Sequence, residues 1–310
     1  MVTGCSSDGG EYLIEGYIAS DSSNLYEDTD SEIAKLTNHL SNDEEYDDNS
    51  YNFILSPEEL AEIQKRLENT RLPVLLYHHL LPDDLNTNHR YNAAVISLEA
   101  FEEQMAYLYT NGFTTITISQ LEDFLLHQIP LPERSVMIHF DDGYYSNFVY
   151  AMPVLERYNF IAQLFLIGKA VYDRGDTQPP MNHEGLTFTA AITIEDTEHV
   201  FETANHTFAK HHTVSGTPYT AFVYYDIETV EADMIRGFDF VNDHRAFAYP
   251  QGQYSSETIQ MLTNLGVTQA FTTQKGYVTI YSNNMLLPRF IIFPTTTLED
   301  FSRIVNGLDE

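Results

Sequence analysis

SVMIHFDDGY, residues 135–144, gives the clearest indication of the fold class of this chain. Four of its first six residues are apolar, which predicts a buried strand. Two adjacent carboxylates, Asp141 and Asp142, follow directly at the carboxyl end of that strand. Because neighbouring strand side chains diverge, one carboxylate can bind a metal ion while the other takes a proton from water. Taken alone, however, Asp-Asp-Gly is more often an ordinary turn.

Short β-rich runs alternate with helical patterns on both sides of this stretch, which predicts parallel βα units and a barrel-like α/β fold. The other strands are expected at 73–77, 114–118, 163–167, 201–205, 245–249 and 268–272. Helices are expected before Gly112, after a cap formed by Ser119 with Glu122, and from Glu257 to Leu265. In such folds the chemistry gathers where strands end, so polar residues at those points are the candidates for a site.

Two further segments carry such residues. His206 and His211 follow the predicted strand 201–205. Two imidazoles and one carboxylate make a three-ligand site with open positions, which suits a divalent ion, although a chain with 12 His brings some together by chance. The strand at 245–249 ends in the turn Pro250-Gln251-Gly252, which can aim backbone N–H groups at a developing oxyanion, or can be a simple strand exit.

The charge of the chain excludes one class of partner. Of its 310 residues 15 are Lys or Arg and 46 are Asp or Glu, a net charge of −31. This charge repels phosphate backbones and anionic lipids, so nucleic acid is not an expected partner. It is compatible with a cationic partner such as a glucosamine polymer, although solubility alone also explains it.

The first 52 residues contain 13 acidic residues and a single Lys, which predicts a disordered acidic tether. The only cysteine, Cys5, excludes a disulfide framework, and the sequence around it resembles the lipobox of bacterial lipoproteins. We therefore expect a lipid anchor at Cys5, the alternative being a chance tetrapeptide. Residues 53–71 form a helical lead-in, with a capping box from Ser56 to Glu59, and residues 72–305 form the main domain. No stretch of 18 apolar residues occurs, and residues 173–200 have no periodicity that assigns them a role.

In this order and at these strand ends, the three segments resemble those of the polysaccharide deacetylase family, carbohydrate esterase family 4. The resemblance covers about residues 72–305. It is closest to the branch that deacetylates poly-β-1,6-N-acetylglucosamine in biofilms, because PVLLYHH, residues 73–79, stands ahead of the Asp-Asp pair. In that branch the motif order is circularly permuted. Further matching text lies at 101–105, 111–116, 155–158 and 287–290.

The resemblance implies a distorted (β/α) barrel and a role for each motif residue. Asp141 corresponds to the general base, and Asp142, His206 and His211 to the ligands of one divalent metal ion. Zinc is the expected ion, with cobalt, nickel or iron as alternatives. His78 corresponds to the general acid, with His79 as its rival, and the backbone N–H of Gln251 to an oxyanion donor. Arg289 corresponds to a residue that orients or tunes the base. No organic cofactor is implied.

The chain departs from the family pattern at several of these positions. His139 stands where a Thr is usual, and it is either a packed neighbour of the site or an extra ligand. Many relatives have three residues between the two His ligands, and at that spacing this chain has Lys210 in place of His211. Gln251 replaces a common aromatic residue, and the chain has no Trp to form the usual wall of the substrate groove.

The resemblance implies metal-assisted N-deacetylation of an extracellular polymer containing N-acetylglucosamine, with release of acetate. The expected enzyme is a monomer outside the cell or on its surface, a bacterial lipoprotein touching the membrane only through Cys5. One alternative is an O-acetyl esterase acting on xylan or peptidoglycan. Another is a catalytically silent glycan-binding surface protein, which would have no need for the complete set of base, ligands and acid.

Overall fold

The computed structural model describes residues 55–87, 89–174 and 197–309. The predicted tether at 1–52, the anchor residue Cys5 and most of the region 173–200 lie outside them. The chain divides into two compact units, Met1–Gln64 and Lys65–Glu310. All elements from β1 onward belong to the second unit. In the described part of the chain, no helix combines the length and apolar composition needed to cross a membrane.

The predicted lead-in helix is present as α2, Pro57–Asn69. Its capping box is formed as expected, because the Ser56 N–H donates to the Glu59 carboxylate at 2.6 Å and the Glu59 N–H donates to Ser56 Oγ at 3.2 Å. Pro57 occupies the first helical position, where the N–H that it lacks would have had no partner within the helix.

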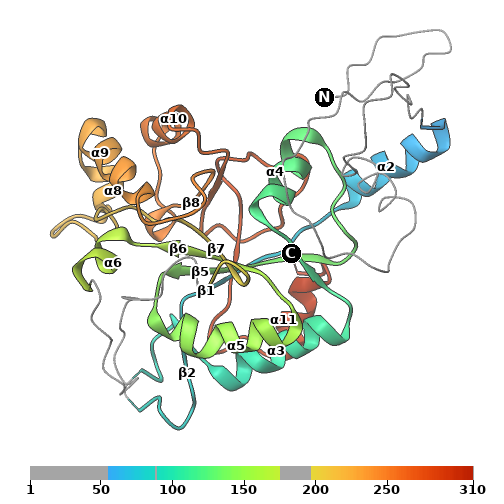
Figure 1. The fold of residues 1–310 in the computed structure, drawn as a ribbon, viewed down its shortest axis with the longest axis horizontal. Helices are drawn as coiled ribbons and strands as arrows, with labels where there is room; N and C mark the ends of the chain where they lie inside the picture. The colour runs from blue at the N-terminus through green and yellow to red at the C-terminus, as the bar shows by residue number, and fades with distance from the viewer. Residues whose placement is uncertain (1–54, 88, 175–196, 310) are drawn as a thin grey trace, which may run out of the picture. The chain divides into compact units, whose positions relative to one another are not determined.

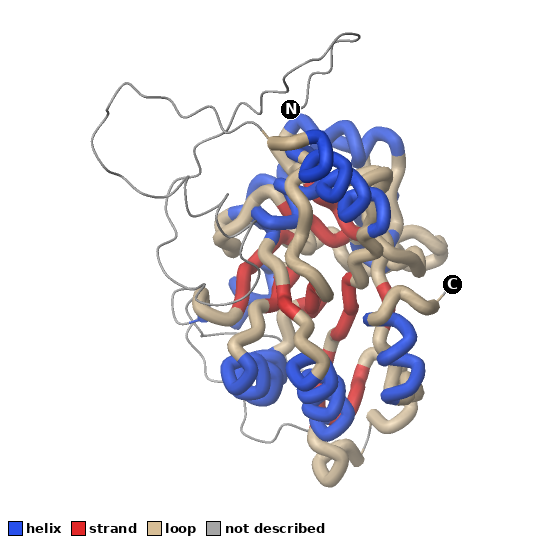
Figure 2. The backbone as a smooth tube through the Cα atoms, turned by 90° about the vertical axis from the view of Figure 1, so that its right-hand side faces the viewer, coloured by secondary structure: helices blue, strands red, loops and turns tan. Residues whose placement is uncertain are grey.

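A curled parallel sheet forms the interior of the second unit, with helices on its outside (Figures 1 and 2). Its strand order is β10-β1-β5-β6-β7-β8-β9, with β4 paired to the start of β5. The strands are β1 (Val74–Tyr77), β4 (Thr114–Thr115), β5 (Ser135–Asp142), β6 (Ala162–Leu166), β7 (Phe201–Asn205), β8 (Ala246–Ala248), β9 (Gln269–Phe271) and β10 (Phe290–Ile291). A separate parallel pair consists of β2 (His79–Leu81) and β3 (Val95–Ser97).

The two edges of the main sheet approach each other. Phe271 of β9 forms a parallel bridge with Leu287, which leads into β10. The result is a distorted half-barrel of parallel strands, and the predicted α/β fold is confirmed.

The helices are α3 (Leu98–Thr110), α4 (Ile118–His127), α5 (Met152–Tyr158), α6 (Gly168–Arg174), α8 (Ala221–Tyr224), α9 (Ile227–Phe238), α10 (Ser256–Asn264) and α11 (Leu298–Val305). A π-helical turn, η1 (Asn147–Ala151), precedes α5, and a 3-10 turn, η2 (Pro250–Gly252), follows β8. Figure 1 shows α3, α5 and α11 together on one side of the sheet, where apolar residues such as Phe101, Leu155 and Phe301 pack against strand residues such as Phe140. A second apolar cluster joins α8, α9 and α10 to β8 and β9.

The predicted start of α4 was wrong. Thr117, not Ser119, is the N-cap, and its capping box is closed by Gln120. The strand expected to reach residue 118 therefore ends at Thr115. The reason is tertiary: Arg245 donates to Ser119 Oγ at 3.0 Å and to the Glu122 carboxylate at 2.7 Å, so neither side chain caps the helix.

Candidate active site

Strand register brings the candidate residues to one end of the sheet. Tyr77 of β1 is paired with Phe140 of β5, so the next residues, His78 and Asp141, come at the same level. Asp142 is the last residue of β5 and is paired with Leu166, which is in turn paired with Asn205, the residue before His206. Residues far apart in the sequence therefore meet at the carboxyl ends of adjacent parallel strands.

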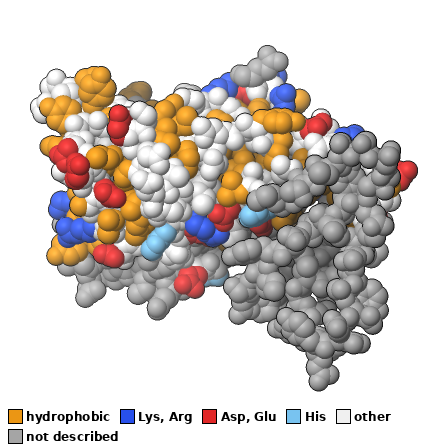
Figure 3. All heavy atoms as spheres, turned by 90° about the horizontal axis from the view of Figure 1, so that it is seen from above, with side chains coloured by type: hydrophobic (Ala, Val, Ile, Leu, Met, Phe, Trp, Pro, Cys, Tyr) orange, Lys and Arg blue, Asp and Glu red, His pale blue; other side chains and the backbone are white. Residues whose placement is uncertain are grey.

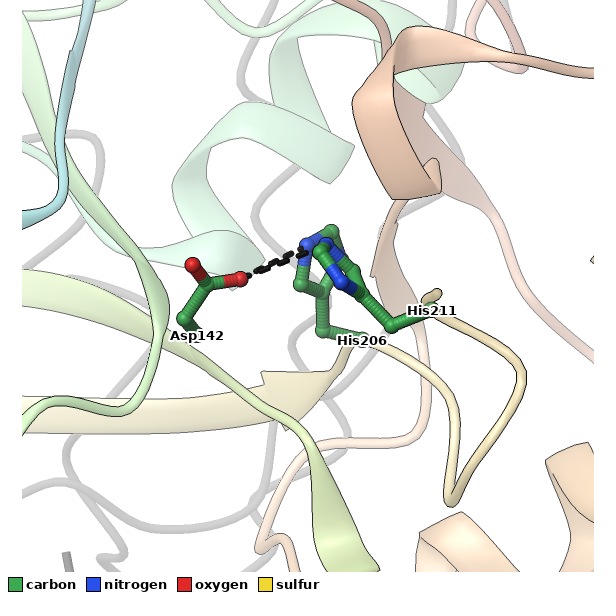
Figure 4. A group of neighbouring side chains, drawn as sticks. All are labelled: Asp142, His206 and His211. Carbon is green, nitrogen blue, oxygen red and sulfur yellow. Dashed lines mark ion pairs between the residues drawn. The ribbon is translucent and has the colours of Figure 1, made fainter. Parts of the chain in front are cut away.

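Asp142, His206 and His211 form one cluster, and each offers an atom that lies within 4.8 Å of the other two. Figure 4 shows both imidazoles directed at the Asp142 carboxylate. The Nε2 atoms of His206 and His211 lie 3.5 and 3.3 Å from the same oxygen, Oδ1 of Asp142. Asp142 also has a left-handed backbone, with φ of 74°. A non-glycine residue pays a conformational cost there, and such outliers concentrate at functional sites.

The donor set of this cluster fits a divalent metal ion. Oδ1 of Asp142 is buried and accepts no hydrogen bond from the described residues. Buried charged oxygens in proteins are normally hydrogen-bonded or bound to a metal ion. Two imidazoles and one carboxylate are a common ligand set for zinc and other divalent transition metals. Burial, followed by the charge of the neighbouring His206, lowers the pKa of His211 to about 4. His211 is therefore neutral at pH 7, as a ligand must be.

His206 is held in the tautomer that a ligand needs. Its Nδ1 lies 2.7 Å from the carbonyl oxygen of Ala248, the last residue of β8. A carbonyl oxygen can only accept, so Nδ1 carries a proton, and in the neutral ring Nε2 then has its lone pair directed at Asp142. Sequence reasoning missed this contact, because a backbone carbonyl leaves no mark in the sequence.

The loop after β7 decides which side chain accompanies His206. Lys210 places its Nζ 4.6 Å from the ring centre of Tyr225, outside the cluster, while His211 points to Asp142. The loop is fixed by Asp233 of α9, whose carboxylate accepts from the N–H groups of Phe208 and Ala209, both at 2.9 Å. Sequence reasoning also missed Asp233, which is 25 residues from Phe208 and has no motif around it.

Asp141 forms a buried ion pair with Arg289. The guanidinium donates two hydrogen bonds to the carboxylate, at 2.9 and 2.8 Å, and its Nε donates to the carbonyl oxygen of Thr272. Arg289 is fully buried. Burial by itself would raise the pKa of Asp141, but the charges of Arg289, His206 and His78 outweigh it and hold the pKa well below its usual range. Asp141 is therefore an anion at neutral pH.

The segment after the two aspartates anchors the Tyr77-His78-His79 segment. Asn147 donates to the carbonyl oxygen of His78 at 2.8 Å, and Ser146 Oγ accepts from the Leu80 N–H. His79 is buried, contacts Ser146 through Nδ1 and stacks on Tyr144 with ring centres 5.1 Å apart. His78 is only half-buried, and its charge contributes to the lowered pKa values of Asp141 and His211.

Two more residues complete the surroundings of the cluster. Burial and the neighbouring Asp142 carboxylate raise the pKa of Tyr144, so its hydroxyl stays protonated. His139 is fully buried between Phe165 and Phe271, with ring centres 4.9 and 4.5 Å away, and it is not part of the ligand cluster. The sequence left two interpretations of His139 open, a packed neighbour of the site or an extra ligand. The observed position agrees with the packed neighbour.

Gln251 lies in the turn after β8, close in the chain to the Ala248 carbonyl that orients His206. Its backbone is left-handed, with φ of 52°. Its side chain donates to Thr213 Oγ1 at 2.9 Å, two residues beyond His211. The turn that holds the proposed oxyanion donor is thus tied to the loop that holds the ligand.

A half-barrel with this donor set at its strand ends is typical of hydrolases that use a bound divalent ion. The family model described as polysaccharide deacetylase matches residues 128–270, which include the Asp-Asp pair, both clustered histidines and Gln251. Over these residues the chain is similar to the polysaccharide deacetylase family, and this similarity identifies it as a hydrolase.

Known proteins similar to the chain include deacetylases of poly-β-1,6-N-acetyl-D-glucosamine. The putative polysaccharide deacetylase YxkH of Bacillus subtilis is 26% identical over 81% of this chain and 86% of its own length. The poly-β-1,6-N-acetyl-D-glucosamine N-deacetylase of Escherichia coli is 24% identical over 69% of this chain, which spans 36% of that longer protein. The structure of IcaB from Ammonifex degensii superposes with a TM-score of 0.61 at 23% identity, over 78% of this chain and 99% of IcaB.

Proposed function

We propose that this protein removes acetyl groups from N-acetylglucosamine units of an extracellular polymer, poly-β-1,6-N-acetylglucosamine or a related cell-surface glycan, with one divalent ion held by Asp142, His206 and His211. The observation that carries the proposal is the pairing of this cluster with Asp141, a carboxylate next to it that Arg289 keeps ionised. The Escherichia coli relative, named for the same polymer, supports the substrate class.

The residues around the cluster divide the hydrolysis of an amide among them. A divalent ion held by Asp142, His206 and His211 would supply a Lewis acid that polarises the acetyl carbonyl and makes water more acidic. Asp141 accepts a proton from the attacking water, whose oxygen bonds to the acetyl carbon. The backbone N–H of Gln251 donates to the oxygen that becomes negative. His78 gives a proton to the nitrogen as the carbon–nitrogen bond breaks, which leaves acetate and a free amine.

The substrate is tested by acetate release from β-1,6-linked and β-1,4-linked N-acetylglucosamine oligomers and from acetylated xylan. The protein is first stripped of metal and then given zinc, cobalt, nickel or iron in turn. We expect activity on the β-1,6 oligomers that disappears on stripping and returns with metal. Release from xylan but from neither oligomer would instead support the O-acetyl esterase alternative.

The general acid is tested by comparing two neighbouring histidines. His78→Ala should lower turnover by about 10²-fold or more, the range for loss of a positioned acid, and should leave the metal content unchanged. His79→Ala should mainly lower the thermal unfolding temperature, because His79 is buried against Tyr144 and Ser146. If His79→Ala loses turnover at unchanged stability while His78→Ala does not, the acid is His79.

An enzyme that acts on an extracellular polymer must itself be outside the cell. We therefore also propose that the protein is located on the cell surface, is anchored through Cys5 and is a monomer. Recovery of the full-length protein in the soluble cytoplasmic fraction would contradict this location.

A further inference from the structure

A pocket of about 710 Å³ lies between two segments of the folded unit. One wall is formed by residues 218–224, which lead into and include α8, and the other by residues 252–255, which follow η2. The volume falls in the range of small-molecule sites, about 300–1,000 Å³. None of the residues that contribute to the mechanism lines this pocket.

Both walls continue directly from the candidate active site. The first begins just after His211: Thr213 bridges to Thr220, and the Ala221 N–H donates to the carbonyl oxygen of His212 at 2.8 Å. The second begins at Gln251, whose side chain is bonded to Thr213. The pocket is therefore built from the continuations of the ligand loop and of the proposed oxyanion turn.

Gln253 holds the two walls at a set distance. Its Oε1 accepts from the Thr220 N–H at 2.8 Å, and its Nε2 donates to the carbonyl oxygen of Pro218 at 3.0 Å. Because one amide side chain bonds to two points of the opposite wall, the pocket is formed before any ligand arrives. Preformed sites avoid an ordering cost on binding.

The pocket presents tyrosine rings. Tyr219 and Tyr224 line it and are 55% and 50% exposed, which is high for large aromatic side chains. Tyr254 also lines it and packs on Tyr249 with ring centres 5.4 Å apart, so its ring is fixed from behind. An aromatic face packs well on the C–H face of a sugar ring, and the phenol hydroxyl can bond to a sugar hydroxyl.

No residue lining the pocket carries an acidic or basic side chain. The side of the unit on which α10 lies is also made largely of hydrophobic and other uncharged side chains (Figure 3). A phosphate or a protonated amine would have no counter-charge in the pocket, so its burial there would cost free energy. A neutral sugar does not have this cost. The acetylated form of a glucosamine unit is neutral, and the deacetylated form is a cation.

We propose that this pocket is a sugar subsite that binds a neutral, still acetylated unit of the polymer while another unit is hydrolysed at the cluster. The inference rests on the proposed function and names the form of the substrate that the enzyme prefers. A polymer whose units next to the reacting one are already deacetylated is therefore a poorer substrate.

The test uses the full chain and the variants Tyr219→Ala, Tyr224→Ala and the double variant, with Tyr281→Ala as the matched control. Tyr281 is 76% exposed and does not line the pocket. On an N-acetylglucosamine pentamer the double variant should show a KM raised about tenfold, the effect of losing aromatic contacts worth about 1.4 kcal/mol, with kcat nearly unchanged. On an aryl acetate ester, which has no second sugar unit to place in the pocket, all variants should match the wild type.

A second measurement does not depend on activity. Calorimetry of the metal-free protein measures the dissociation constant of the acetylated pentamer, which should rise about tenfold in the double variant. The deacetylated pentamer should bind to the wild type with a dissociation constant higher by a similar factor. If the wild type releases acetate but the double variant binds and turns over the pentamer normally, the subsite is overturned and the proposed function stands. If the wild type releases no acetate but the double variant loses pentamer binding, the proposed function fails and the subsite stands. Equal binding of both pentamers to the wild type would overturn its preference for a neutral unit.

Discussion

Asp142→Ala should leave the protein with almost no divalent metal and with no measurable release of acetate. Asp142 contributes the only carboxylate of the cluster, and both imidazoles face its Oδ1 atom. Without that negative charge, two neutral imidazoles bind a divalent ion much more weakly. The measurements are metal per chain by elemental analysis and acetate release at saturating N-acetylglucosamine oligomer.

Two variants of the loop after β7 serve as the matched pair for this experiment. His211→Ala should reproduce the loss of metal seen for Asp142→Ala, because its Nε2 lies 3.3 Å from the same oxygen. Lys210→Ala removes the neighbouring side chain, which packs on Tyr225, and should keep its metal. Loss of metal from Lys210→Ala together with full metal in His211→Ala would mean that the ligand spacing is that of the other relatives.

Asp141→Asn should keep its metal and lose turnover by about 10²–10⁴-fold, the range for removal of a positioned general base. The amide has nearly the shape of the carboxylate and can still accept from Arg289, but it cannot take a proton from water. Metal content should be unchanged because Asp141 is not one of the three clustered residues. Turnover and metal per chain are measured on the same preparation.

Stability needs its own measurement in this variant, because Arg289 is fully buried and would lose its counter-charge. Breaking a buried ion pair in this way costs on the order of 3–5 kcal/mol. The free energy of unfolding should therefore fall, and turnover is expressed per folded molecule, measured by circular dichroism. If Asp141→Asn empties the site while Asp142→Ala retains its metal, the roles of the two aspartates are reversed.

The local sequence predicted the fold because its signals depend on near neighbours. The apolar run before Asp141 predicted β5, and the alternation of such runs with helical patterns predicted a parallel α/β sheet. The cap at Ser56 predicted α2 for the same reason, since a capping box is complete within four residues. The start of α4 could not be predicted in this way, because Ser119 and Glu122 are hydrogen-bonded to Arg245, which is more than 120 residues away in the sequence.

The candidate site shows the same division. The sequence predicted which polar residues come at strand ends, and parallel strands bring those ends to one edge, so Asp142 and His206 were expected to meet. The resemblance to a family supplied the roles proposed for Arg289 and His78, which no local pattern indicates. The sequence left several alternatives open, among them His211 or Lys210 as a ligand and a packed or a ligating His139.

Only the tertiary structure decides between such alternatives, because each depends on groups distant in the chain. The N–H groups after His206 are held by Asp233, and Tyr225 attracts Lys210, which leaves His211 to face Asp142. His139 is enclosed by Phe165 and Phe271 from two other strands. The sequence predicted the parallel α/β units and the strand ends that carry the polar residues, since hydrophobic periodicity and capping act over a few residues. Which side chains face one another at those ends was decided by packing and hydrogen bonds between segments 25 to 150 residues apart, such as the pair of Asp141 with Arg289.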